Sequence, residues 1–180
     1  MDDLRSKVKQ DKSLLEKIMF FIPLYHGYKE KELRRESDRL LRSYIYQILT
    51  DSKNSLKKSQ QHFIDANKME LAKKIDKLIV SCDTVSQKIN HAESGYSGFW
   101  DAVKVKEKGL DTIYEIDSKI ASIAIETKKL STELILQSIS NDNIRMVKST
   151  IGTITEKIEA LDNEINDRRN FLHGYGNLDG

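Results

Sequence analysis

Proline and cysteine are almost absent from this sequence of 180 residues, which contains only Pro23 and Cys82. Proline inside a helix removes a backbone hydrogen bond and clashes with the preceding turn, so a chain whose one proline lies near its start can be helical over most of its length. A single cysteine excludes an internal disulfide and a zinc site built from cysteines. Cys82 falls on an apolar helical face, and we interpret it as a small core residue.

The sequence also lacks a long hydrophobic run and a strong excess of charge of one sign. The longest nearly apolar stretch, residues 18–25, is far too short to cross a membrane. The net charge of +2 gives no whole-chain argument for nucleic acid or membrane binding. Residues 1–88 carry a net charge of +6 and residues 89–180 a net charge of −4, which favours packing of the two halves on each other. The first residues do not resemble a secretory signal, so we expect a cytoplasmic location.

Apolar residues recur at spacings of three and four in four segments, which is the pattern of amphipathic helices. We predict helices from just after Gly27-Tyr28 to about residue 66, from residue 68 to about 92, around residues 113–134, and from Asn141 or Asp142 to about residue 172. The predicted core positions, in chain order, are Leu33, Leu40, Tyr44, Ile48, Leu56, Phe63, Leu71, Ile75, Leu78, Cys82, Val85, Ile89, Ile113, Ile116, Ile120, Ile123, Leu130, Leu134, Ile144, Val147, Ile151, Ile154, Ile158, Leu161, Ile165 and Leu172.

Four long helices with mostly short connections predict an all-α fold, an elongated antiparallel up-down-up-down four-helix bundle. The bundle would comprise residues 23–173, preceded by an amphipathic N-terminal extension at residues 1–22 and followed by a flexible tail at residues 174–180. The weakly helical run Thr50–Ser55 predicts a kink or a break. Gly152, in mid-helix, is interpreted as a close-packing point. Such a rod is compatible with a homo-oligomer.

Glycine and aromatic residues are concentrated in three short stretches, residues 23–28, 94–100 and 171–176. Alternating chain direction would bring these stretches to one end of the bundle and leave two plain polar turns, near Ala66-Asn67 and Ser140-Asn141, at the other. Two interpretations stay open: the aromatic residues close the end of the bundle, or they bind a partner. The candidate partner-binding residues are Tyr25, Tyr28, Arg34, Arg35, Arg39, Tyr96, Phe99, Trp100 and Tyr175.

The first predicted helix begins with an arginine-rich face. Arg34, Asp38 and Arg42 are spaced four residues apart, which predicts a ladder of ion pairs on one solvated, self-paired face. Arginine in place of lysine also allows recognition of carboxylates and other anions, because the guanidinium group binds them through two parallel hydrogen bonds.

Two sequence boxes resemble a family of prokaryotic helical proteins of uncharacterised function. Residues 22–42 are similar to that family's pattern I-P-G-Y-x-G-Y-K-x-K-E-x-R-R-E-x-D-x-x-L-R, with Leu24 where the family tends to have glycine. Residues 95–105 resemble its second box, Y-x-G-F-F-D-A-V-K-V, with Trp100 where it tends to have phenylalanine. Residues 1–21 would be an added extension. The resemblance implies a helical architecture and a pairing of the two boxes, and it implies no activity.

The residues that catalysis or metal binding would need are not found in a usable pattern. None of His26, His62, His91 or His173 has Asp or Glu three positions before it, so a ferritin-like di-iron site is excluded. No two histidines lie within one helical turn, and no Gly-x-x-x-x-Gly-Lys-Ser/Thr loop is present. We therefore expect no enzymatic activity, no cofactor and no metal.

The leading hypothesis is a non-enzymatic interaction or scaffold protein that binds an unknown protein partner through the aromatic, glycine- and arginine-rich pole. The first alternative is peripheral attachment to a membrane surface through residues 1–25, which combine lysines with an apolar Phe20-Phe21-Ile22 cluster. The second is weak nucleic-acid binding. The scattered lysines do not favour it, because they lack interleaved aromatic residues. Those lysines are Lys53, Lys57, Lys58, Lys68, Lys73, Lys74 and Lys77.

Overall fold

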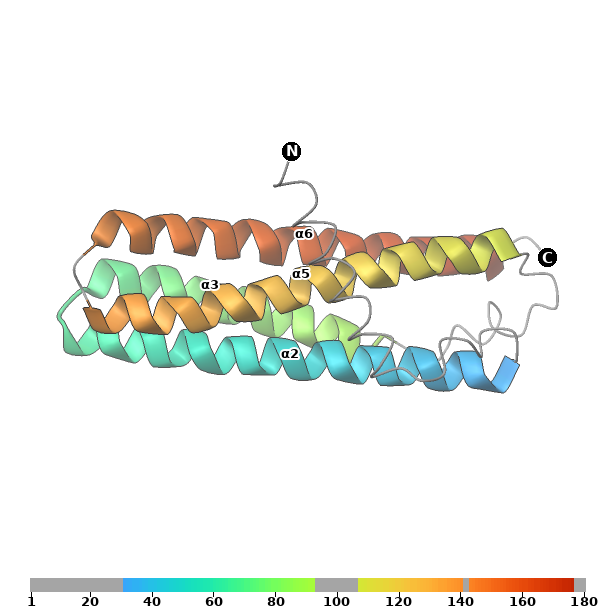
Figure 1. Ribbon diagram of the computed structural model, residues 1–180, viewed down its shortest axis with the longest axis horizontal. Helices are drawn as coiled ribbons and strands as arrows, with labels where there is room; N and C mark the ends of the chain where they lie inside the picture. Colours follow the sequence, from blue (N-terminus) through green and yellow to red (C-terminus); the bar gives the residue numbers. More distant parts are fainter. Residues whose placement is uncertain (1–30, 93–106, 141–142, 177–180) are drawn as a thin grey trace, which may run out of the picture.

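The computed structural model describes residues 31–92, 107–140 and 143–176, and every regular element in these ranges is an α-helix (Figure 1). The helices are α2 (Lys31–Asp65), α3 (Met69–Asn90), α5 (Glu107–Ser140) and α6 (Ile144–Gly176). They pack side by side, so the predicted all-α four-helix bundle is confirmed. The predicted N-terminal extension at residues 1–22 lies outside the described residues.

Each helix contributes one seam of buried residues at spacings of three and four, and the four seams form a single core. Two predicted core positions are wrong. Leu40 is exposed because the seam of α2 passes through Leu41 and Ile45 instead. Ile144 is exposed because it is the first residue of α6 and the inward-facing position of that turn belongs to Val147.

The predicted kink or break at residues 50–55 is wrong, because α2 runs through them without interruption. Serine weakens helices when its hydroxyl group competes for backbone hydrogen bonds. Here the hydroxyl groups bond back to carbonyl oxygens of the same helix, with Ser52 Oγ donating to Ile48 O at 2.9 Å and Ser59 Oγ to Ser55 O at 3.2 Å. Ser52 and Ser59 are fully buried on the seam of α2, so packing stabilises the helix there.

Two turns join the helices into hairpins. After α2, Asn67 adopts a left-handed conformation with φ of 56°, and Lys68 N donates to Phe63 O at 2.7 Å, a Schellman-type helix end. The predicted start of α6 at Asn141 or Asp142 is wrong, since Asn143 caps this helix: its Oδ1 accepts a hydrogen bond from Met146 N at 3.0 Å. At its other end, α6 continues to Gly176, three residues beyond the predicted end of the bundle.

Gly152 is not a close-packing point. No described atom outside its own helix backbone and chain neighbours lies within 4 Å of the position that a side-chain carbon would take. The helices therefore do not approach each other more closely at this residue.

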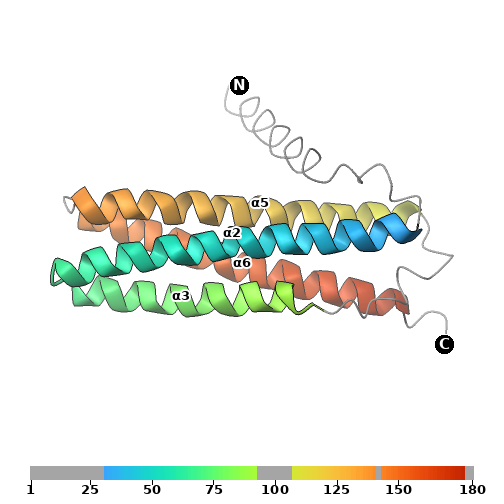
Figure 2. The ribbon, with the colours of Figure 1, turned by 90° about the horizontal axis from the view of Figure 1, so that it is seen from below.

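The four helices surround the core in the order α2, α3, α6, α5, which Figures 1 and 2 show from two directions. The α3–α6 side has the least extensive contact of the four. Helices α3 and α5 follow each other in the chain but lie on opposite corners of the bundle. Helices α2 and α6 occupy the other two opposite corners. The end of α3 and the start of α5 therefore belong to diagonally opposite helices.

Side-chain contacts show that α2 and α5 are parallel. Asp51 Oδ2 lies 2.7 Å from Lys128 Nζ, and His62 Nδ1 lies 2.8 Å from Ser138 Oγ, so residue numbers rise together along the two helices. Chain direction alternates from helix to helix as predicted. The neighbours in space are nevertheless not all antiparallel, because the ring order differs from the chain order.

Side-chain contacts show that α3 and α6 are parallel as well. Lys148 Nζ lies 3.7 Å from Glu70 Oε1 near the start of both helices, and Lys88 Nζ lies 2.6 Å from Asp162 Oδ1 farther along. The α2–α3 hairpin therefore packs on the α5–α6 hairpin with α2 parallel to α5 and α3 parallel to α6.

Helix α3 is shorter than its neighbours, and this makes the two ends of the bundle different. It has 22 residues, whereas α2, α5 and α6 have 35, 34 and 33. At about 1.5 Å per residue, α3 stops roughly 15–20 Å short of one end. We call this end, where α2 and α5 begin and α6 ends, the aromatic end. The opposite end, with the turns at residues 66–68 and 141–143, is the turn end (Figure 1).

The fold analysis predicts a stabilising substitution at Ser131. Among the described residues, the buried Ser131 hydroxyl group has no hydrogen-bond partner. An unsatisfied buried hydroxyl group costs about 1–3 kcal/mol, so Ser131→Ala should raise the free energy of unfolding by about 1 kcal/mol in urea denaturation followed by circular dichroism.

Ser52→Ala is the matched control, because Ser52 is equally buried in a helix but its hydroxyl group is bonded. Both changes gain the same intrinsic helix propensity, so the difference between them measures the orphaned hydroxyl group. Equal effects of the two substitutions would contradict the prediction.

Candidate functional site

Four charged side chains meet inside the bundle near the aromatic end, and we call them the charge cluster: Asp38, Arg42, Asp117 and Arg168. Helix α2 supplies Asp38 and Arg42, α5 supplies Asp117, and α6 supplies Arg168. Asp38, Asp117 and Arg168 are all at least 95% buried. Charged residues are almost never buried this deeply unless they are paired, so the geometry of the pairing decides what the cluster does.

Arg168 is the centre of the charge cluster. Its Nε donates to Asp117 Oδ1 at 2.6 Å, and its Nη2 donates to Asp38 Oδ1 at 2.6 Å. One guanidinium group therefore bridges two carboxylates from two different helices. The contact with Asp38 crosses the bundle between the diagonal helices α6 and α2.

Arg42 completes the charge cluster and links it to α3. Its Nε donates to Asp38 Oδ2 at 3.0 Å, and its Nη1 donates to the backbone oxygen of Ala92, just after α3, at 2.7 Å. Two carboxylates and two guanidinium groups make the charge cluster electrically neutral. All four helices are joined at the level where α3 ends.

Of the predicted ladder through Arg34, Asp38 and Arg42, the ion pair between Asp38 and Arg42 forms, but it is buried and not solvated. Asp38 and Arg42 form the i, i+4 ion pair, with Arg42 Nη2 2.9 Å from Asp38 Oδ2. Their side chains are only 7% and 12% exposed, so this is not a solvated face. The side chain of Arg34 lies outside the described part of the structure.

Burial and ion pairing act in opposite directions on the pKa values of Asp117 and Arg168. Burial raises the pKa of Asp117, and Arg168 lowers it; the net direction is upward, because burial is the largest effect and the nearby carboxylate of Asp38 adds to it. Burial alone would lower the pKa of Arg168, but the attraction of Asp117 and Asp38 outweighs it and raises that pKa. Arg168 is therefore a permanent buried cation, and burial makes ionisation of Asp117 less favourable in the folded state.

Sequence reasoning missed Asp117 and Arg168, although a signal for both was present. Asp117 lies four residues after Ile113 and three before Ile120, and Arg168 lies three residues after Ile165 and four before Leu172. Both are thus at seam positions of their helices, where apolar residues are expected. Opposite charges at seam positions of two predicted helices indicate a buried ion pair.

The helix ends that the three aromatic stretches join are placed toward the aromatic end. Lys31, Glu107 and Gly176 lie there, and α3 ends at the level of the charge cluster below. Of the predicted partner-binding residues, Arg39 is exposed on α2 and engaged in a further interaction. Arg34 and Arg35 lie in α2 and Tyr175 in α6, where the backbone alone is described. Tyr25, Tyr28, Tyr96, Phe99 and Trp100 lie outside the described residues.

The prediction of two polar turns left out the helix ends beside them, which carry exposed apolar residues. Exposed apolar side chains surround the two turns of the turn end, among them Leu136 at 67% and Ile139 at 63% exposure near the end of α5. The prediction considered the residues of the turns themselves. It did not consider apolar residues in the adjoining helix ends, which lie beyond the last layer of the core.

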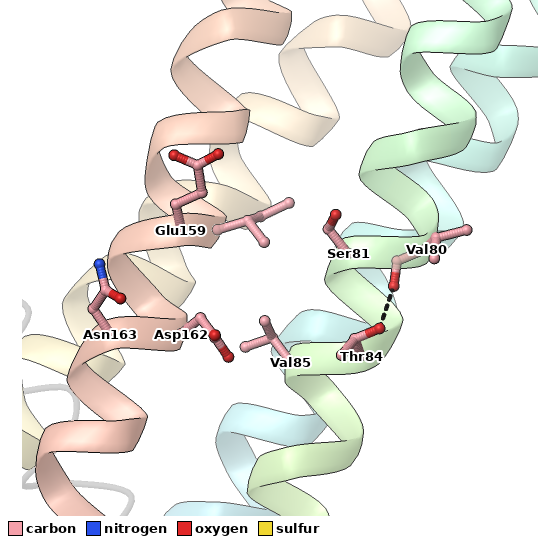
Figure 3. Close-up of a pocket in the computed structure, with 8 residues that line it drawn as sticks. Val80, Ser81, Thr84, Val85, Glu159, Asp162 and Asn163 are labelled. Carbon is pink, nitrogen blue, oxygen red and sulfur yellow. Dashed lines mark hydrogen bonds between the residues drawn. The ribbon is translucent and has the colours of Figure 1, made fainter.

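A shallow groove of about 280 Å³ lies between α3 and α6, the side of the bundle with the least contact (Figure 3). Its lining combines three apolar with five polar residues, and the Lys88–Asp162 ion pair crosses between the same two helices at its edge. Ligand sites usually exceed about 300 Å³ and enclose most of the ligand. The groove is too small and too open for that. Its lining residues are Val80, Ser81, Thr84, Val85, Ile158, Glu159, Asp162 and Asn163.

The described residues contain no group of three or more His, Cys, Asp or Glu side chains that could hold a metal ion. Cys82 is a buried core residue, as predicted. Burial raises the pKa of its thiol to about 12, so the reactive thiolate form is suppressed at neutral pH. None of the described helices has a stretch apolar enough, over enough residues, to cross a lipid bilayer.

The predicted basic face is partly neutralised within the bundle. Lys53 pairs with Asp83 on α3, and Lys74 pairs with Glu70 one turn away. Paired lysines contribute little to a sequence-independent attraction for phosphates. These contacts weaken the case for nucleic-acid binding.

Comparison of the chain with protein-family models, with curated proteins and with solved structures found no match in any of the three. The resemblance of the two sequence boxes to a prokaryotic helical family stays a prediction. Any function has to be inferred from the residues of this chain.

Removing the central cation of the charge cluster should destabilise the protein strongly. Arg168→Met leaves two buried carboxylates without their shared partner, and breaking a buried ion pair costs about 3–5 kcal/mol. The free energy of unfolding in urea measures the loss. Arg169→Met is the matched control, because Arg169 is the exposed neighbour and should change stability by no more than about 0.5 kcal/mol. Similar losses from both substitutions would mean that the charge cluster has no special role.

The loss in free energy of unfolding caused by Arg168→Met should also depend on pH. A carboxyl group whose pKa is raised in the folded state keeps a proton that the unfolded state has released, so its contribution to stability falls as pH rises through the folded pKa. Loss of Arg168 removes the charge that lowers the pKa of Asp117, which extends this fall to higher pH. The difference from wild type should therefore increase as pH rises from acidic values to pH 7.

Adding Asp117→Asn to Arg168→Met provides the control for this titration. The double variant should recover part of the stability lost at pH 7 and should show a flatter pH dependence than Arg168→Met alone. A deficit that is the same at every pH would instead assign the loss to packing of the arginine side chain.

Proposed function

We propose that this protein is a non-enzymatic interaction or scaffold protein that binds a protein partner through its aromatic end. Its main support is the convergence of helix ends. In the sequence, the three glycine- and aromatic-rich stretches precede α2, lie between α3 and α5, and form the end of α6. The start of α2, the start of α5 and the end of α6 lie at the aromatic end, which supports a common surface for these stretches.

The charge cluster supports this proposal because it makes the region below the aromatic end rigid. Arg168 joins α6 to α5 and α2, and Arg42 joins α2 to the end of α3. Binding costs less free energy when the surface that binds is already ordered. The charge cluster lies about 10–15 Å from the helix ends, at a rise of about 1.5 Å per residue, so it holds in place the helices that carry the proposed binding surface.

The chemistry of the candidate residues also fits protein recognition. Tyrosine, tryptophan and arginine are enriched among the residues that carry most of the binding energy in protein interfaces. The residues proposed to form this surface are Tyr25, Tyr28, Arg34, Arg35, Arg39, Tyr96, Phe99, Trp100 and Tyr175. Peripheral membrane attachment through residues 1–25, which lie outside the described ranges, stays the alternative.

Site-specific photo-crosslinking tests the proposal. A photoreactive phenylalanine at position 100 of the full chain should capture a defined protein in cells. The same group at position 80, which is exposed in the middle of α3, is the matched control and should not capture it. Replacing Tyr28 and Arg35 by alanine should then weaken binding of the purified partner by at least about 30-fold, since interface residues of this kind contribute about 2 kcal/mol or more.

Circular dichroism should show unchanged helicity in the alanine variant. If that folded variant binds the captured protein as well as wild type does, the aromatic end is not the binding surface. Capture of the same proteins from positions 100 and 80 would contradict the proposal as well.

A further inference from the structure

The α3–α6 side is the least tightly packed of the four sides of the bundle. The short length of α3 does not explain this, because the contact of the same helix with α2 is the most extensive of the four. The groove of about 280 Å³ lies between α3 and α6, and Figure 3 shows side chains of the two helices facing each other across it. Packing therefore resists separation of α3 from α6 less than separation of any other neighbouring pair.

Polar contacts hold α3 on α2. In the core, Cys82 Sγ donates to the backbone oxygen of Leu49 at 3.5 Å, and both residues are fully buried. Nearer the surface, Lys53 Nζ of α2 lies 2.5 Å from Asp83 Oδ1 of α3. These contacts lie next to the extensive apolar packing between the same two helices. If α3 moves, they favour movement together with α2.

The ion pairs that the described residues form between α3 and α6 are exposed to solvent. Lys88 Nζ lies 2.6 Å from Asp162 Oδ1, with side chains that are 41% and 31% exposed. Lys148 Nζ lies 3.7 Å from Glu70 Oε1, and Glu70 also pairs with Lys74 of its own helix. Exposed ion pairs contribute little to stability, because water solvates both ions well when they separate. These pairs oppose separation of α3 from α6 only weakly.

Helix α6 is held from the other direction. Arg168 of α6 bonds to Asp117 of α5 and to Asp38 of α2 in the charge cluster, at the level where α3 ends. At the turn end, the two turns join α2 to α3 and α5 to α6, so neither of them ties α3 to α6. The freedom of α3 and α6 to separate therefore increases from the charge cluster toward the turn end.

From this distribution of contacts we propose that the bundle opens along its α3–α6 side, with α3 moving away from α6 together with α2 while α6 stays on α5. The α2–α5 side, opposite in the ring, is the hinge, and the charge cluster limits the movement near the aromatic end. The opening exposes buried core residues that border the groove, Val85 and Ile158. Such local openings have lower free energies than global unfolding.

The opening is independent of partner binding at the aromatic end. It depends on contacts between α3 and α6, whereas the proposed binding surface lies beyond the end of α3. Failure of either proposal leaves the other standing, because the experiment on the opening needs no partner.

Thiol labelling of the full chain, in urea below the unfolding transition, tests the opening. Val85→Cys in a Cys82→Ala background places a thiol where α3 borders the groove. The introduced thiol should be labelled at least about 100-fold faster than global unfolding of the same variant allows, with a weak dependence on urea, because a local opening exposes less surface. Cys82 of wild type, one turn away and in contact with α2, is the matched control and should be labelled only through global unfolding.

Each labelling rate is compared with the urea unfolding curve of the same variant, so that a loss of global stability does not imitate the opening. Ile158→Cys in the same background repeats the measurement from α6 if Val85→Cys does not fold. Labelling of the introduced thiol only through global unfolding would overturn the proposal. Early labelling of Cys82 would overturn it as well, because α3 would then be leaving α2.

Two surface ion pairs distinguish the two sides of α3. Asp162→Asn removes the pair with Lys88 that the opening breaks, so it should speed labelling of the introduced thiol about threefold, the effect of an exposed pair. Lys53→Gln removes the pair with Asp83 that the opening leaves intact, so it should leave this labelling rate unchanged. Neither substitution alters α3 itself. Equal acceleration by both, or acceleration by Lys53→Gln alone, would contradict an opening between α3 and α6, and so would no acceleration by either.

Discussion

The position of Arg168 between Asp38 and Asp117 is the constraint on which the arrangement of the bundle depends. Seams of isoleucine, leucine and serine repeat every seven residues, so apolar packing alone changes little if a helix slides by one heptad or exchanges neighbours. The guanidinium group of Arg168 reaches both carboxylates only when α6 lies beside α5 and diagonally across from α2. A buried charge without its partner costs several kcal/mol. The charge cluster therefore penalises the alternative registers and ring orders that the apolar seams would tolerate.

The sequence was sufficient to predict the helices, their direction and most of the core, because these depend on local periodicity. The spacing through Val147, Ile151 and Ile154 has only one helical interpretation, and the structure agrees with it. Ring order is different, since alternation of direction is compatible with more than one arrangement of four helices. What decides it here is a contact between Asp38 and Arg168, 130 residues apart. Only a search for opposite charges at seam positions could have found that contact.

The errors of prediction occur where a helix ends or where a polar residue is buried. Extending the seam of α6 to its outermost apolar residue predicted that Ile144 is buried. Ile144 is exposed, because the first turn of a helix has no further core layer to pack against. Low helix propensity at Thr50–Ser55 predicted a break, but buried serines that bond to their own helix backbone are tolerated when the rest of the face is packed. Of the three aromatic stretches, residues 171–176 form the end of α6, and residues 23–28 and 94–100 lie outside the described ranges.

The two ends of the bundle differ in the physical means that organise them, and this difference argues for a division of roles. Near the aromatic end the helices are held by buried charges whose geometry is fixed, while α3 is too short to cover its neighbours. At the turn end the helices are held by short turns, and apolar side chains are left on the outside. Fixed charge pairs favour a single rigid conformation, and exposed apolar area favours association. The two ends of the bundle are thus stabilised by different interactions, buried charge pairs near one end and short turns at the other.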